Sequence, residues 1–227
     1  MAQQTAHASV DARERVLSAA AELFAERGYH GTSVRDIAAA CGLKPSSLYS
    51  HVPDKSTLLA DLVMRYLGAL EAALEASSAD PGGGPSANRV EEMVRASVGV
   101  ALRYPREFLC LSNSWTYIRR TPSLATLVAR RDAVRAVWQR ALREAAADGS
   151  LRADVDPESM LRVVFAATHG VVDRRYDEIA GPADEGDPAG VLAALLLDGF
   201  RPRGRAVSAT VRAGTADAGA VRPGLAE

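Results

Sequence analysis

The sequence predicts an all-α protein, and three observations support this. Apolar residues recur three and four positions apart over long stretches, as from Leu58 to Leu74, which is the period of a helix with one buried face. Prolines directly follow residues that can cap a helix, with Pro122 after Thr121, Pro157 after Asp156 and Pro188 after Asp187, which indicates helix starts. No useful stretch alternates between apolar and polar residues as a half-buried strand would. Hydrophobic residues make up 48% of the chain and charged residues 24%, which is typical of a globular protein.

The N-terminal part predicts an arm followed by three helices. Residues 1–10 are polar and are expected to form a flexible arm. A first helix is expected over residues 11–27, because Val16, Ala20 and Phe24 share one face and a glycine follows. The next segment, residues 32–55, predicts two short helices joined by a tight corner.

Local signals mark the ends of these two short helices. Ser33 and Asp36 have capping-box spacing, and Gly42 stands where a helix can end in a left-handed residue. Pro45 suits the first position of the second short helix, where no amide hydrogen is needed. Helices this short are unstable alone, so we expect the first helix to pack across them.

The remainder of the chain also predicts helices. The long helix expected over residues 55–77 would link the N-terminal domain, residues 11–54, to a second domain that spans residues 55–201. The glycine-rich stretch after it predicts a flexible break, and residues 202–227 lack periodicity and predict a disordered tail. Further helices are expected at residues 88–104, 106–117, 122–148, 157–180 and 188–200.

The second short helix presents groups suited to nucleic acid. Its exposed side offers Lys44, Ser46, Ser47, Tyr49, Ser50 and His51, which can bind phosphates and base edges. The net charge of -1 gives no global attraction to nucleic acid, so a DNA contact must rest on a local surface.

The span from about Arg13 to Leu70 resembles the N-terminal DNA-binding domain of TetR-family transcriptional regulators. The segments AAELFAERGYHGTSV, IAAACGL and LYSHVPDKSTLL carry the resemblance. It implies a three-helix helix-turn-helix domain, followed by a C-terminal helical domain for ligand binding and dimerisation. The sequence departs from the family at two positions: Lys44 stands where a small capping hydroxyl is usual, and Cys41 where alanine is common.

The resemblance also implies a set of DNA-contacting residues. Arg35 matches a position that often touches a base or phosphate, and Lys55, with little reason to pack, matches a lysine that holds a backbone phosphate. Two alternatives stay open: Tyr49 could pack into the core, and His51 could only cap the helix end. The expected set comprises Thr32, Ser33, Arg35, Lys44, Pro45, Ser46, Ser47, Tyr49, Ser50, His51 and Lys55.

The last two expected helices predict a homodimer. Apolar residues surround both the helix near residues 157–180 and the helix near residues 188–200. A helix that is apolar all round must be buried all round, and a small domain has too few helices to cover two of them. A second copy of the chain would cover them. It would also supply a second copy of the second short helix, so that the pair could contact the two halves of a palindromic DNA site. The alternative is deep burial within a monomer.

These expectations combine into a ligand-responsive regulator. We expect a repressor that is released from double-stranded operator DNA by a small, largely apolar inducer. The stretch DGSLRADVDPESM resembles family branches that respond to lipid or acyl-CoA metabolites. Candidate pocket residues, each of which could instead be plain core, are Met93, Phe108, Trp115, Tyr117, Trp138, Phe165 and His169.

No enzyme signal is found in the sequence. It has no common catalytic motif and no metal-ligand spacing, so we expect no catalysis, metal or cofactor. His169 and Asp173 share a helix face, but no nucleophile accompanies them. Absence of a signal-peptide pattern and of a long apolar run predicts a cytoplasmic protein outside the membrane. Two rival classes remain: a helical carrier or enzyme with a non-functional DNA-binding head, and a regulator controlled by a protein partner.

Overall fold

A computed structural model describes residues 2–50, 52–78, 85–173 and 186–202. Within these ranges the protein is all-α, as predicted, and contains no strand. No helix among them is long and apolar enough to cross a membrane. The helices are α1 (Ala2–Arg27), α2 (Val34–Ala40), α3 (Pro45–Leu48), α4 (Lys55–Ser78), α5 (Ser86–Arg103), α6 (Pro105–Ile118), the 3₁₀ turn η1 (Pro122–Leu124), α7 (Ala125–Ala147), α8 (Pro157–Val172) and α10 (Pro188–Phe200).

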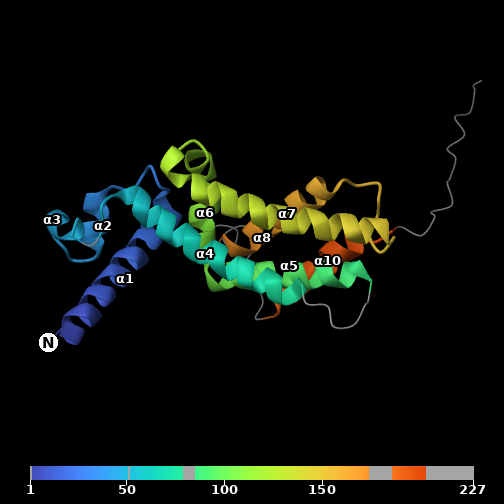
Figure 1. Cartoon of the computed structure of the whole chain (residues 1–227), viewed down its shortest axis with the longest axis horizontal. Helices are drawn as coiled ribbons and strands as arrows, with labels where there is room; N and C mark the ends of the chain where they lie inside the picture. Colours follow the sequence, from blue (N-terminus) through green and yellow to red (C-terminus); the bar gives the residue numbers. More distant parts are fainter. Residues whose placement is uncertain (1, 51, 79–84, 174–185, 203–227) are drawn as a thin grey trace, which may run out of the picture.

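Helices α1, α2 and α3 gather at one end of the molecule, and α4 runs from them into a second, larger group of helices (Figure 1). We call α1–α3 the head. Its core consists of apolar side chains from every element, among them Phe24, Ile37 and Leu48, each at most 1% exposed. Helix α4 packs on α1 of the head and on α5, α6 and α7 of the larger group. One continuous helix therefore connects the two groups.

The caps expected around α2 are confirmed. The Ser33 side chain accepts a hydrogen bond from the Asp36 amide (3.2 Å), and the Asp36 carboxylate accepts one from the Ser33 amide (2.7 Å). The glycines that follow α1 and α2, Gly28 and Gly42, have positive φ angles of 75° and 67°. A side chain at either position would be strained, which explains why glycine ends these helices.

Three expectations about helix ends were wrong. Helix α1 begins at Ala2, so residues 2–10 are helical where a flexible arm was expected. Helix α8 ends at Val172, because Asp173 has an extended backbone. Thr121 makes no side-chain capping bond, and its proline starts a 3₁₀ turn. Residue 1, residues 174–180 of the expected longer helix and residues 203–227 of the expected tail lie outside the described residues.

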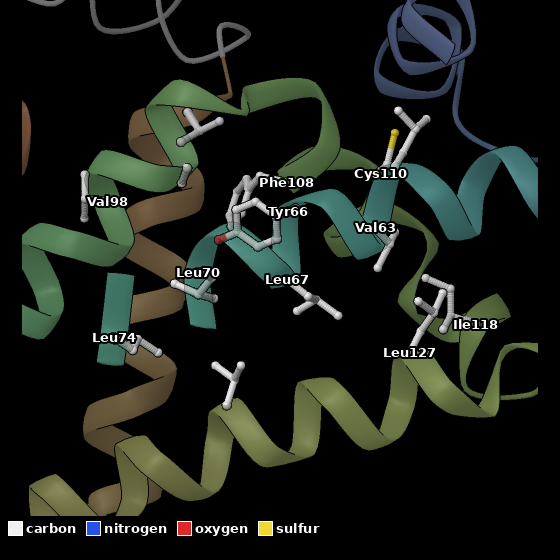
Figure 2. Packing of buried hydrophobic residues seen from close by; sticks show 14 of the residues in the cluster. Val63, Tyr66, Leu67, Leu70, Leu74, Val98, Phe108, Cys110, Ile118 and Leu127 are labelled. Carbon is white, nitrogen blue, oxygen red and sulfur yellow. The ribbon is translucent and has the colours of Figure 1, made fainter. Parts of the chain in front are cut away.

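The core of the second group is built around α4. Figure 2 shows Leu67 and Leu70 of α4 between the neighbouring helices, and Tyr66 beside Phe108 of α6. The Tyr66 and Phe108 rings meet edge to face at 5.6 Å. All four side chains are at least 95% buried, so α4 and α6 share one packed layer.

Not every apolar side chain of α8 and α10 is buried in a single chain. Val163 and Val171 of α8 are 47% and 37% exposed, and Val191 and Leu195 of α10 are 59% and 67% exposed. The two helices pack against each other, so these residues belong to adjacent elements. We call these four residues the α8–α10 face.

Candidate DNA-binding surface and ligand pocket

Helix α3 and the turn after it present the predicted reading residues to solvent. Leu48, which is buried, holds α3 to the head, while Tyr49 is 56% exposed. The alternative in which Tyr49 packs into the core is therefore excluded. The other expected contacts from this segment are also exposed: Lys44, Pro45, Ser46, Ser47 and Ser50. His51 lies outside the described residues.

The amino end of α2 contributes a second exposed cation. Arg35 is exposed and makes no ion pair within the described part of the chain, so its guanidinium is available to a phosphate or base. Ser33 is exposed, but its hydroxyl donates to Asp36 at 2.6 Å. That bond, together with the one from the Ser33 amide, lowers the pKa of Asp36.

Thr32 is expected to contact DNA, yet its side chain points inward. The residue is 2% exposed, and its hydroxyl donates to the carbonyl oxygens of Gly28 (3.0 Å) and Leu23 (3.1 Å). Its role in this structure is to hold the turn between α1 and α2. The short hydroxyl bonds local backbone, as is common for threonine in turns.

Lys55 also has a structural role, contrary to the expectation that it has little reason to pack. Its ammonium donates to the carbonyl oxygens of Tyr29 (2.7 Å) and Thr32 (2.8 Å) and lies 4.1 Å from the centre of the Tyr29 ring. Burial lowers the pKa of Lys55. An ammonium has three N–H donors, so one remains for a phosphate after these two bonds.

An aromatic cluster joins the head to α6. The rings of Tyr29 and Tyr117 stack with centres 4.4 Å apart, and their hydroxyls are 3.1 Å apart. The His30 ring meets both edge-on, at 5.3 and 5.2 Å. Burial, and next the bond with Tyr117, raise the pKa of Tyr29. We call Tyr29, His30 and Tyr117 the aromatic junction; it places Tyr117 away from the pocket where it was expected.

A cavity of about 220 Å³ lies between α4, α6, α7 and α8. Four of the predicted pocket residues line it: Phe108, Trp115, Phe165 and His169. Met93 and Trp138 do not; both are fully buried elsewhere in the core. The remaining lining residues are Tyr66, Leu67, Leu70, Leu111, Ser112, Arg131, Val134 and Arg135.

The cavity has apolar walls and a cationic edge. Arg131 stacks on Trp115, with its guanidinium carbon 3.9 Å from the ring centre. Arg135 is paired with Glu158. Sequence reasoning missed both arginines. Each lies three positions before a buried residue of the same helix, Arg131 before Val134 and Arg135 before Trp138, so each shares a helix face with a buried residue.

No group of three or more His, Cys, Asp or Glu side chains that could hold a metal is found among the described residues. His169 lies beside Phe108, with ring centres 5.9 Å apart, and faces the cavity. The structure thus contains two candidate sites in different places: an exposed polar surface on the head, and an apolar cavity in the larger group of helices.

Comparison with known proteins matches both parts of the chain. Residues 16–62 match the family model described as bacterial regulatory proteins, tetR family, and residues 83–199 match the tetracyclin repressor-like C-terminal domain. The HTH-type transcriptional repressor KstR2 of Mycolicibacterium smegmatis is 26% identical over 204 residues, covering 88% of this chain and 96% of the relative.

Solved structures agree on the fold. The ketosteroid transcriptional regulator KstR2 of Mycobacterium tuberculosis has a TM-score of 0.71 at 24% identity, covering 84% of this chain and 95% of that one. AibR, solved in complex with isovaleryl coenzyme A and operator DNA, has a TM-score of 0.69 at 21% identity, covering 84% and 98%. The two KstR2 proteins are named as a transcriptional repressor and a transcriptional regulator, which is a non-enzyme class.

Proposed function

Because the chain belongs to the TetR family of bacterial transcriptional regulators, we propose that it is a dimeric repressor released from a palindromic operator by a small ligand. The observation that carries this proposal is the position of α6. The helix lines the cavity through Phe108 and Trp115 and contacts the head through Tyr117. One rigid element therefore touches both the candidate ligand site and the unit that holds the reading surface.

In this proposal α3 enters the major groove of double-stranded DNA. Ser46, Ser47 and Tyr49 face the base edges, while Lys44 and Arg35 contact phosphates on either side. Short hydroxyl side chains allow close approach, and the two cations supply the salt-dependent part of the affinity. Their exposure and the anchoring of α3 by Leu48 support this assignment.

The α8–α10 face would form the dimer interface. Four large apolar side chains on two adjacent helices are costly to leave in water, and a second copy would bury them in a four-helix contact. A two-fold axis through this contact would present two reading helices to one side of the duplex. Half-sites one helical turn apart, about 34–36 Å, would then form a palindrome.

The aromatic junction offers a route for induction. Trp115 lines the cavity and Tyr117 follows it by two residues on the same helix, so a ligand that displaces α6 would displace Tyr117. Tyr117 stacks on Tyr29, whose carbonyl accepts from Lys55 at the start of α4. Movement of the junction would tilt the head and change the separation of the reading helices. A coupling of about 1–3 kcal/mol would weaken DNA binding about 5–150-fold.

Selection of bound sequences from random DNA tests the regulator directly. We expect enrichment of a palindrome, salt-dependent binding as a dimer, and loss of binding in Tyr49→Ala without loss of helix content. Failure to enrich any sequence would support the rival class, a carrier or enzyme with a non-functional head. Operator binding that responds to no small molecule would instead support control by a protein partner.

A screen for release of the selected DNA would follow. It would include apolar compounds, carboxylic acids with apolar bodies, and the coenzyme A thioesters of those acids. The apolar walls of the cavity favour a lipid-like ligand or the acyl group of a larger one. The relative AibR, crystallised with isovaleryl coenzyme A, indicates one chemistry to include.

A further inference from the structure

The cavity holds an arginine with no carboxylate partner. Helix α7 carries three arginines close together, and two of them are neutralised: Arg130 by Glu71 and Arg135 by Glu158. Arg131 makes no ion pair within the described part of the chain, although it is partly buried and lines the cavity. A cation removed from water without a partner is costly, so its position calls for a functional explanation.

The stacking of Arg131 leaves its hydrogen-bonding capacity free. The guanidinium lies over the face of Trp115 at 3.9 Å, so the ring supports it from one side. Its N–H donors point outward in the guanidinium plane, in a fork that matches the two oxygens of a carboxylate. The indole therefore holds the fork in place without occupying its donors.

The charges around the cavity favour an anion. Its lining includes no Asp or Glu residue. The carboxylate nearest to the lining arginines, Glu158, already accepts from Arg135 (Nε to Oε2, 3.2 Å) and from Gln139 (3.0 Å). Burial, and next the like charge of Arg135, lower the pKa of Arg131, while the charges of Asp132 and Glu158 act in the opposite direction without forming an ion pair with it. A bound anion would add to the effect of these two carboxylates.

The remaining walls define the other part of the ligand. Leu67, Leu70, Phe108 and Phe165 offer aliphatic and aromatic surface, and Ser112 uses its hydroxyl hydrogen on carbonyls of its own helix. The volume of about 220 Å³ is below the ~300–1,000 Å³ of typical sites for drug-sized ligands, so the cavity suits a compact molecule.

We propose that the cavity binds a compact apolar monocarboxylic acid, whose carboxylate is held bidentately by Arg131 on its Trp115 support. This inference rests on the proposed function, since it concerns the cavity assigned there as the ligand site. It adds the head group of the ligand and the residue that selects it.

The test compares acids with their primary amides on the full-length protein. Hexanoate, octanoate and 4-phenylbutanoate are each titrated beside hexanamide, octanamide and 4-phenylbutanamide at pH 7 by isothermal titration calorimetry. Each pair shares its apolar body and differs in charge. A bidentate charge-assisted contact is expected to give at least one acid an advantage of about tenfold to a hundredfold over its amide.

Two variants on the same helix test whether Arg131 causes the preference for the acid over the amide. Arg131→Gln is expected to remove the preference for the acid and to leave the binding of the amide nearly unchanged. Arg140→Gln is the matched control, because Arg140 is exposed and does not line the cavity. It should keep the preference. Circular dichroism of both variants checks that they are folded.

Several results would overturn the proposal. These are an absence of acid binding across the panel, equal affinity for acid and amide, or a preference that survives in Arg131→Gln. Binding of octanoyl coenzyme A that needs Arg131, without binding of octanoate, would replace the carboxylate with a phosphate and overturn it as well. Operator binding is measured separately on ligand-free protein, so a failed regulator and a failed ligand class give different results.

Discussion

Replacing Lys55 by methionine tests whether this lysine holds the turn between α1 and α2. The variant keeps an unbranched apolar stem of about the length of the lysine stem and removes the ammonium. It loses hydrogen bonds of 2.7 and 2.8 Å to two carbonyl oxygens, and the contact of the ammonium with the Tyr29 ring. The two carbonyls belong to Tyr29 and Thr32, which flank the segment that leads into α2.

The expected cost follows from these contacts. A hydrogen bond from a charged donor contributes about 1.5–3 kcal/mol, and a cation–ring contact at a partly exposed site about 0.5–1 kcal/mol. Part of this gain offsets the burial of the ammonium, whose effect is seen in the lowered pKa of Lys55. We therefore expect Lys55→Met to reduce the free energy of unfolding by about 2 kcal/mol. Typical total stability is about 5–15 kcal/mol, so the variant should still fold.

Lys44→Met is the matched control, because Lys44 is exposed and its side chain caps no helix. Urea unfolding, followed by far-UV circular dichroism at one protein concentration, should show a change within about 0.5 kcal/mol for this variant. Its operator affinity should fall, and the slope of log affinity against log salt should become shallower by about one. Equal stability of the two variants would refute the structural role of Lys55.

Three further predictions concern other parts of the chain. Leu195→Glu should place a charge in the α8–α10 face and give monomers in analytical ultracentrifugation; an intact dimer would refute that interface. Tyr117→Ala should reduce stability by about 2–4 kcal/mol and weaken operator binding in a mobility-shift assay, because the stack on Tyr29 is lost; unchanged DNA affinity would show that the stack does not orient the head. Hydrogen bonds, first with Ser150, lower the pKa of Asp148 in the folded protein. The ionised carboxylate therefore stabilises the fold at pH values above its ordinary pKa near 3.8, and this stabilisation is lost as pH falls through the lower folded-state pKa. Thermal unfolding of Asp148→Asn should therefore depend less on pH below about 4, and an unaltered pH dependence would contradict this.

Local signals in the sequence were sufficient to predict the helices and most of the positions where they begin and end. The capping box at Ser33 and Asp36 and the glycines at positions 28 and 42 act over a few residues, so their chemistry is visible in the sequence itself. The start of α1 was missed because residues 2–10 are polar and lack a cap, although they are helical in the structure.

The candidate sites were predicted less completely, since they depend on contacts between distant segments. Tyr29 and Tyr117 are 88 residues apart in sequence, and no local pattern indicates that their rings stack. Likewise, the sequence indicates only a phosphate-binding role for Lys55, because the two carbonyl oxygens that its ammonium contacts come from residues more than 20 positions away. Arg131 carried a usable signal, because its spacing from Val134 places it on the inner face of α7.

The single-turn length of α3 bears on how operator preference could evolve. Leu48 secures the turn, while Ser46, Ser47 and Tyr49 contribute almost nothing to the interior of the head. Substitutions at these three positions can therefore accumulate with little thermodynamic penalty. Under the proposed function, a lineage could therefore change the DNA it recognises while retaining the same scaffold.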